Sequence, residues 1–253
     1  MIEIDYKRWG ILRSKLVFFG DDLPTTEGYH FVIVENCFSK LTYHPFFILR
    51  EKNNIIIDLT KEIEVLFNQM TKMRRRVIKD GLKMDYQITH QEARLDLLRE
   101  FKNLYNRFIP GKGATPIVSL NHFKALLPYM TIFQGKYEDR TLEIVLLVHD
   151  GQTVKDFYNV RDESLKGSKV LNCIGSVLHW EILMYFKTLG YRTFDLGGVV
   201  PSRPAIQDYK LSFGGKVIPT YSYEAALTPM AKIIGKIQQI SERKIRRFCH
   251  RNL

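Results

Sequence analysis

One hairpin constrains the fold of this chain more than any other feature of its sequence. Leu142 to Val148 (LEIVLLV) is a run of strand length that is apolar at every position except Glu143, which is typical of a buried strand. Asp150-Gly151 is a two-residue turn signal, and Thr153 to Tyr158 returns as a second strand. A strand buried on both faces needs a covering layer on each side, so we expect the chain to fold around a central sheet.

Helical periodicity on either side of this hairpin supplies the covering layers. Apolar residues recur at helical spacing in four stretches, at about 60–81, 92–107, 119–127 and 174–189. Further strands are expected at 29–35, 46–50, 55–58, 192–196 and 216–223. This order predicts an α/β protein with a mixed central sheet flanked by helices.

The chain is expected to have three parts. Residues 1–57 form a short β-rich N-terminal segment that packs on the main domain, residues 58–225 form the main domain, and residues 226–253 form a C-terminal helix. That helix ends in the basic run Arg243 to Arg251. No repeat, low-complexity tract or interdomain linker separates these parts.

The charge of the chain favours anionic partners. Lys and Arg total 38 against 27 Asp and Glu, a formal net charge of +11, which suits RNA, a nucleotide-linked substrate or an anionic membrane face, although many basic proteins bind none of these. No apolar run is long enough to span a membrane and no secretory signal is recognisable, so we expect a cytoplasmic protein. The three cysteines fit neither a zinc site nor a disulfide framework, and no metal site is predicted.

Three segments carry a distinctive pattern of charged, aromatic and glycine residues. The first, Thr71 to Gly81 (TKMRRRVIKDG), is a basic helical stretch that ends in glycine. In the second, the helical segment Leu178 to Glu181 (LHWE) is followed by Phe194 to Gly198, which reads aromatic-Asp-x-Gly-Gly. The third, Tyr209 to Gly215 (YKLSFGG), reads aromatic-Lys-x-x-Phe-Gly-Gly.

In this order and at these separations, the three segments resemble a domain of the Fem family of peptidoglycan interpeptide-bridge aminoacyltransferases, within the GNAT acyltransferase superfamily. The resemblance covers about residues 58–225 and implies a GNAT-like fold. It also implies acyl or aminoacyl transfer with no tightly bound cofactor and with aminoacyl-tRNA or acyl-CoA as the donor. Arg74 departs from the pattern, because the family usually has an apolar residue there.

The resemblance places the family's functionally important lysine at Lys210, which is the first catalytic candidate, because a cation beside the reacting carbonyl stabilises the charge that develops there. Asp195, at the end of a predicted strand, is the second, as an acceptor of a proton or an orienting group for the amine. Substrate-binding candidates are Arg75, Arg76, Lys79, Tyr209, Gly197, Gly198, Gly214 and Gly215. Each has a structural alternative: a surface lysine, a capping carboxylate, a solvated basic helix face or a plain turn.

We therefore expect an enzyme that moves an acyl or aminoacyl group onto an amino group of a cell-envelope precursor by direct attack. Its acceptor would be an anionic nucleotide- or lipid-linked molecule, with tRNA and the inner face of an anionic membrane as further partners. One alternative is an acyl-CoA-dependent N-acyltransferase that acts on an amino sugar or amino acid in polysaccharide biosynthesis. A second is a non-catalytic GNAT-like module that binds RNA or an anionic membrane.

Overall fold

The structure is a computed structural model that describes residues 1–8, 10–42, 45–108, 120–199 and 204–234. The chain divides into two compact units. One comprises Lys52–Phe108 and Leu126–Pro219, and the other comprises Met1–Glu51, Ile109–Ala125 and Thr220–Leu253. The larger unit, Lys52 to Pro219, contains all three segments singled out above.

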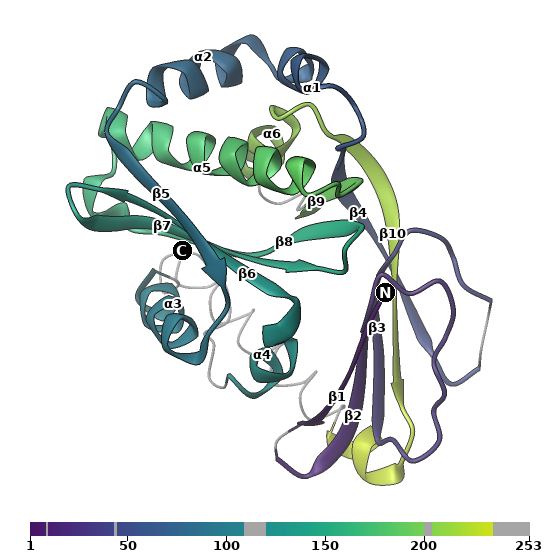
Figure 1. The fold of residues 1–253 in the computed structure, drawn as a ribbon. Coiled ribbons are helices and arrows are strands. Elements are labelled where there is room, and N and C mark those ends of the chain that lie inside the picture. Colours follow the sequence, from purple (N-terminus) through teal and green to yellow (C-terminus); the bar gives the residue numbers. More distant parts are fainter. Residues whose placement is uncertain (9, 43–44, 109–119, 200–203, 235–253) are drawn as a thin grey trace. The chain divides into compact units, whose positions relative to one another are not determined.

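The larger unit is built on a mixed sheet whose strands follow the order β4-β9-β8-β7-β6-β5. Strands β8 and β9 are parallel neighbours, and the other adjacent pairs are antiparallel. Figure 1 shows these strands side by side. Their bounds are β4 Ile48–Asp58, β5 Tyr86–Glu92, β6 Met130–Tyr137, β7 Arg140–His149, β8 Thr153–Arg161 and β9 Thr193–Gly198.

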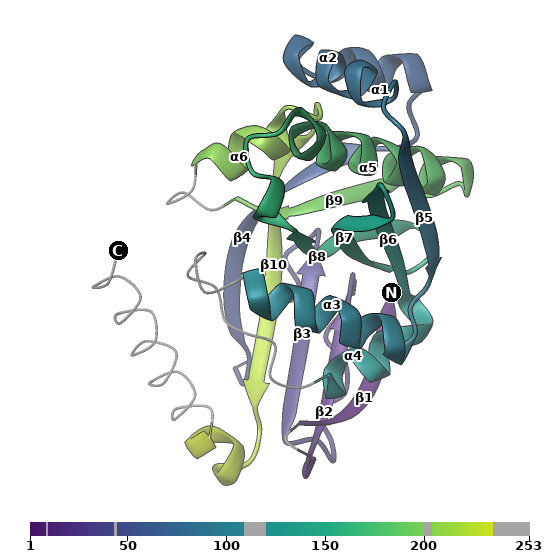
Figure 2. The same cartoon turned by 90° about the vertical axis from the view of Figure 1, so that its left-hand side faces the viewer.

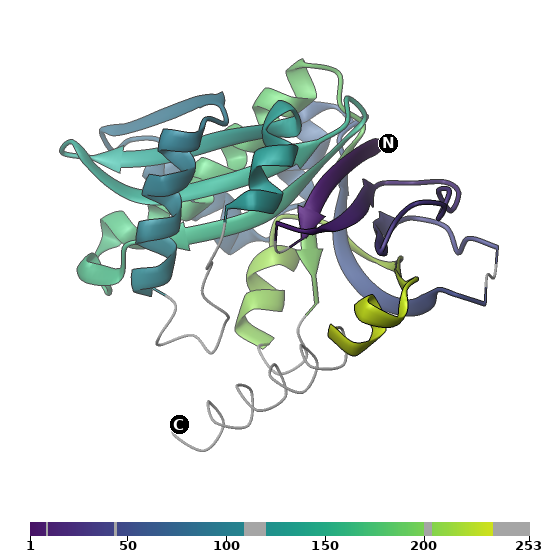
Figure 3. The same ribbon diagram turned by 90° about the horizontal axis from the view of Figure 1, so that it is seen from below.

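Helices cover both faces of this sheet. On one face lies α5 (Lys169–Thr188), with α6 (Pro204–Leu211) beside it and α1 (Ile63–Gln69) and α2 (Lys72–Gly81) packed outside it, as Figures 1 and 2 show. The opposite face is crossed by α3 (Leu95–Phe108), which contacts β8 and is seen from below in Figure 3. The expected α/β fold with a central sheet flanked by helices is therefore confirmed.

The apolar run identified in the sequence lies at the centre of this arrangement. In β7, Leu142 and the residues from Ile144 to Val148 are fully buried, as is Glu143 between them. The predicted turn is present at Asp150, whose side chain accepts hydrogen bonds from the backbone N–H groups of Gln152 and Thr153. The hairpin of β7 and β8 thus anchors the core as its sequence indicates.

Several features of this unit differ from the sequence-based expectation. Helix α6 was not expected, and the two strands expected at 46–50 and 55–58 are one strand, β4. The single helix expected from residue 60 to Gly81 is two helices, because Met70 and Thr71 are extended and the Thr71 hydroxyl caps α2 by accepting from the backbone N–H of Arg74. Strands β5 and β6 were not expected; β5 (YQITHQE) alternates half-buried with exposed residues and carries few apolar side chains.

The smaller unit contains β1 (Ile2–Arg8), β2 (Leu12–Phe18), β3 (Phe31–Cys37) and most of β10 (Lys216–Ala226). Strand β1 is antiparallel to β2, β2 is parallel to β3, and β3 is antiparallel to β10. The basic run predicted at the C-terminus, Arg243 to Arg251, lies outside the described residues. Further short segments are α4 (Asn121–Leu126), η2 (Leu127–Tyr129) and η3 (Glu163–Leu165), and residues 229–234 are also helical.

No helix in the described part of the chain is both long enough and apolar enough to cross a bilayer.

Candidate functional site

The site forms where two parallel strands of the larger unit part. Strands β8 and β9 pair through Thr153–Lys155 and Thr193–Asp195, and among the described residues this pairing does not continue further along either strand. Because the paired residues are the first three of each strand, the unpaired ends of β8 and β9 are their carboxyl ends. In α/β proteins this edge is the usual position for groups that contact a ligand.

Asp195 occupies the last paired position of β9 and is fully buried. One carboxylate oxygen accepts from the Asn54 side chain and from the Lys155 ammonium, each at 2.8 Å. The other accepts from the backbone N–H of Gly197 at 2.7 Å. The carboxylate therefore fixes both the turn that follows β9 and the position of the Lys155 ammonium.

Lys210, on α6, reaches the same place from another part of the sequence. Its ammonium donates a hydrogen bond to the carbonyl of Gly198 at 3.1 Å. Gly197 has φ of +82°, and a Cβ at that position would lie 3.3 Å from the Lys210 Nζ. The two glycine-containing segments of the sequence thus meet at one point, with Lys210 against the end of β9.

The environment of Lys210 favours loss of its charge. Burial lowers the pKa of Lys210; the carboxylates of Asp156 and Asp195 oppose this, and the ammonium of Lys155 adds to it. The net effect is a pKa below the ordinary value for lysine. Two ammonium groups and two carboxylates therefore meet where β8 and β9 part.

The other residues of the third segment have different surroundings. Tyr209 lies on α6, and burial raises the pKa of its hydroxyl, with the charge of Glu143 adding to the effect and that of Arg74 opposing it. Gly214 has φ of +84°, and a Cβ there would lie 2.8 Å from the backbone of Gln69. A Cβ at Gly215 would lie 2.6 Å from Ile55. These two glycines permit close packing on α1 and β4, and a substrate-binding role for them stays a prediction.

The basic side chains of α2 point in different directions. Arg75 donates to the carbonyls of Asn68 and Met70, so it closes the end of α1. Arg76 is 84% exposed in its side chain, and the ammonium of Lys79 lies 5.6 Å from the centre of the Phe67 ring. Among the described residues, none of the three contacts Lys210, and their role in substrate binding stays a prediction.

Arg74, which departs from the family pattern, points into the molecule. Its guanidinium donates to the hydroxyls of Ser212 and Ser176, and its central carbon lies 4.3 Å from the centre of the Tyr209 ring and 4.6 Å from that of Phe213. Burial lowers the pKa of Arg74. Because Ser176 is on α5 and Tyr209 is on α6, this arginine ties the helix of Lys210 to α5.

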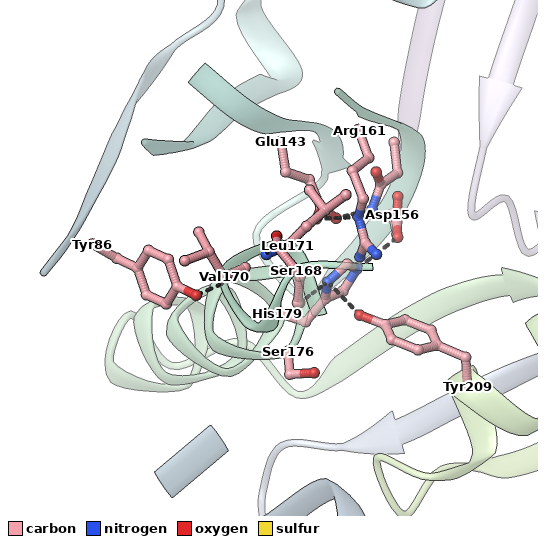
Figure 4. Close-up of polar contacts among 12 residues, drawn as sticks. Tyr86, Glu143, Asp156, Arg161, Ser168, Val170, Leu171, Ser176, His179 and Tyr209 are labelled. Carbon is pink, nitrogen blue, oxygen red and sulfur yellow. Dashed lines mark hydrogen bonds and ion pairs between the residues drawn. The ribbon is translucent and has the colours of Figure 1, made fainter. Parts of the chain in front are cut away.

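A buried histidine continues this polar network (Figure 4). The Nδ1 of His179 lies 2.8 Å from the carbonyl of Gly175, and its Nε2 lies 3.1 Å from the carboxylate of Asp156. Burial lowers the pKa of His179, but the hydrogen bond and charge of Asp156 outweigh it, so the pKa is raised overall. Because both ring nitrogens face acceptors, the geometry fits an imidazolium paired with Asp156. The Tyr209 hydroxyl lies 3.4 Å from Nδ1.

A second buried ion pair lies behind this histidine. Glu143 is fully buried and accepts from Arg161 at 3.0 Å and from Asn159 at 2.8 Å, as part of the network in Figure 4. Gly175 on α5 leaves the space for it, because a Cβ there would overlap the Arg161 guanidinium and lie 2.8 Å from Glu143. The site is thus backed by charged groups that are paired inside the protein.

Sequence reasoning identified Lys210 and Asp195 but not their neighbours. Lys155, Asp156 and His179 contribute to the same network, and none of the three is a candidate from the sequence. One signal was available: Lys155 and Asp156 are adjacent charged residues inside an otherwise strand-forming segment, Thr153 to Tyr158. Within the described residues, no group of His, Cys, Asp and Glu is arranged to hold a metal ion.

Comparisons with known proteins add the fold relationship. No protein-family model matches the chain, and no curated protein matches it. Among solved structures, FemX is similar with a TM-score of 0.59 and 12% identity, over 82% of this chain and 75% of FemX. The C-terminal domain of a protein described as a lysylphosphatidylglycerol synthetase from Agrobacterium fabrum has a TM-score of 0.52 and 12% identity, over 88% of this chain and 81% of that domain.

A third solved structure, L-PGS from Bacillus licheniformis, is similar with a TM-score of 0.51 and 11% identity, over 97% of this chain and 88% of that one. At these identities the similarity concerns the fold. It shows that the chain shares the fold of FemX, as the three sequence segments led us to expect.

Proposed function

We propose that this chain is an acyltransferase that moves an acyl or aminoacyl group from an activated carrier onto an amine of an anionic, nucleotide- or lipid-linked cell-envelope precursor. The observation that carries the proposal is the convergence of Lys210 with Asp195, Gly197 and Gly198 where β8 and β9 part. The fold that the chain shares with FemX also supports the proposal, although one fold can host several chemistries.

The chemistry that we propose is direct attack. The nitrogen of a neutral amine bonds to the acyl carbon, and the bond from that carbon to the oxygen or sulfur of the carrier breaks. The proton released by the nitrogen passes to the departing atom. In the transition state, negative charge builds up on the acyl oxygen, and a group that donates hydrogen bonds to this oxygen accelerates the step.

Lys210 is suited to that stabilising role. Its ammonium uses one hydrogen bond on the Gly198 carbonyl, which fixes its position and leaves two N–H groups of the ammonium for a ligand. Partial burial strengthens its electrostatic interaction with an oxyanion. Asp195 would act indirectly, by holding the Gly197 backbone and Lys155 in place.

The decisive experiment measures transfer of labelled acyl groups by the purified chain. Charged tRNA and acyl-CoA are offered separately as donors, with a nucleotide-linked peptide that carries a free amine and an amino sugar as acceptors. Removing one hydrogen-bond donor to an oxyanion of this kind lowers kcat by about 100- to 1,000-fold. We therefore expect Lys210→Ala to lower kcat to that extent.

Lys216→Ala provides the matched control, because Lys216 is an exposed lysine six residues away. It should transfer at the unmodified rate. The proposal fails if Lys210→Ala is as fast as the unmodified chain, or if neither donor supports transfer to any of these amines. Activity with acyl-CoA alone would instead favour the N-acyltransferase of polysaccharide biosynthesis.

A further inference from the structure

Asp156, on β8, has a buried partner on one side and the ammonium of Lys210 on the other. Its carboxylate lies 3.1 Å from the Nε2 of His179, and its side chain is only 12% exposed. A Cβ at Gly197 would lie 3.3 Å from the Lys210 Nζ and 3.7 Å from the main-chain oxygen of Asp156. Asp156 and Lys210 therefore approach each other across Gly197, where β8 and β9 part.

The other carboxylate near Lys210 already has a cation of its own. Both oxygens of Asp195 accept hydrogen bonds, and one of these comes from the Lys155 ammonium at 2.8 Å. Burial lowers the pKa of Lys210, and of the two carboxylates that oppose this effect Asp156 is the stronger and Asp195 the weaker. Asp156 is thus the carboxylate best placed to compensate the charge of Lys210.

His179 fixes the orientation of the Asp156 carboxylate. The Nδ1 of His179 faces the Gly175 carbonyl one turn earlier on α5, which turns the ring so that Nε2 faces Asp156, as Figure 4 shows. The ring packs against the rings of Tyr209 and Phe213, at centroid distances of 5.9 and 5.6 Å. Because this histidine is buried and held on several sides, it gives Asp156 a fixed hydrogen-bond donor.

Other charged and titratable groups surround these three residues. They are Lys155 and Arg161 on β8, Asp195 on β9, Glu143 on β7, Arg74 on α2 and Tyr209 on α6. Glu143 is paired with Arg161, and Asp195 is paired with Lys155. Asp156, by contrast, stands between two cations, the imidazolium of His179 and the ammonium of Lys210.

We propose that Asp156 is the counterion that keeps Lys210 in its ammonium form, and that His179 positions the Asp156 carboxylate for this role. A buried ammonium without a nearby carboxylate gives up its proton more readily. A neutral amine has no charge with which to stabilise an oxyanion. The effect on transfer rests on the proposed function, in which Lys210 needs that charge. Asp156 and His179 are thus positioning residues that act through Lys210.

The test measures the protonation of Lys210 without turnover. Trace acetylation with acetic anhydride at a series of pH values labels each lysine in proportion to its neutral amine. Mass spectrometry of the peptide that contains Lys210 then gives the midpoint of its titration, with the exposed Lys216 as the internal reference. Asp156→Asn should lower this midpoint by about 1 pH unit, because a nearby carboxylate favours the ammonium by about that amount or more.

Asp208→Asn is the matched control. It removes one carboxylate from the same helix as Lys210, but Asp208 is exposed. Water and salt screen an exposed charge, so this variant should shift the midpoint far less than Asp156→Asn does.

Two variants of His179 test its positioning role. The amide of Gln can still donate to Asp156, whereas Leu has no donor. We expect His179→Gln to keep the midpoint of the unmodified chain or to raise it, and His179→Leu to lower it. Equal midpoints in the two His179 variants, or an unchanged midpoint in Asp156→Asn, would overturn the proposal.

In transfer assays the same change should appear in the dependence of kcat on pH. The pH above which kcat falls should be lower in Asp156→Asn by about 1 unit, with KM little changed. If the midpoint shifts as expected while neither donor supports transfer, the proposed function fails and this role of Asp156 stands. If transfer requires Lys210 but Asp156→Asn leaves the midpoint unchanged, the proposed function stands and this role fails.

Discussion

Gly175 offers the clearest test of how the buried network supports the site. A methyl group at this position would overlap the Arg161 guanidinium and lie 2.8 Å from Glu143. Arg161 has a long, flexible side chain, so Gly175→Ala should move the guanidinium aside and leave the helix intact. Glu143, with no exposed surface, would then lose the cation that neutralises it.

Two opposing effects determine the size of the change. Replacing glycine by alanine in a helix stabilises it by about 1 kcal/mol, whereas depriving a buried carboxylate of its partner costs about 3 to 5 kcal/mol. Because Arg161 keeps part of its surface in solvent and can relax, we expect the lower part of the resulting range. Gly175→Ala should therefore lower the free energy of unfolding by about 2 kcal/mol.

Urea unfolding of the variant measures this change, and a second background makes the cause testable. In a chain that already carries Glu143→Ala and Arg161→Ala, both side chains that the added methyl group would meet are removed and the buried charge is gone. Adding Gly175→Ala to that chain should stabilise it by about 1 kcal/mol, because only the helix propensity remains. The reasoning is refuted if Gly175→Ala destabilises both backgrounds to the same extent.

Two further predictions follow from the network. Gly197→Ala forces a left-handed backbone on alanine, costing about 1 to 2 kcal/mol, and crowds the Lys210 ammonium. With either acyl donor, the kcat of this variant should fall by a larger factor than its KM changes. A change in KM alone would contradict this. Because the pKa of His179 is raised, its pairing with Asp156 stabilises the fold fully below pH about 6.5 and is lost as pH rises through the folded pKa. Urea unfolding at a series of pH values above about 6.5 should show the free energy of unfolding fall as pH rises. In Asp156→Asn this fall should be smaller, and an unchanged fall would exclude the pair as its cause.

Much of the larger unit could be predicted from local sequence. The run Leu142 to Val148 is apolar at every position except Glu143, so burial on both faces was the natural expectation. The Asp150-Gly151 turn determines its connection to β8. The motif around Asp195 and the motif around Lys210 were recognisable as segments, and the structure brings them together.

The remaining features depend on contacts between distant residues. The break between α1 and α2 is made by Thr71, a residue that also occurs inside helices, so periodicity continues across it. Strand β5 pairs with β6 through its backbone and needs few apolar side chains to do so. The pairing of His179 with Asp156 joins α5 to β8, and nothing in the spacing of these residues indicates it.

The parting of β8 and β9 has a consequence for how such a chain can diverge. The shape of this edge depends on a few residues, namely a left-handed residue such as Gly197, the side chains that hold it and the buried strands that keep their register. Substitutions can then accumulate elsewhere while the edge persists. FemX has the same fold at 12% identity, so few of the side chains that the two chains carry are needed to maintain it.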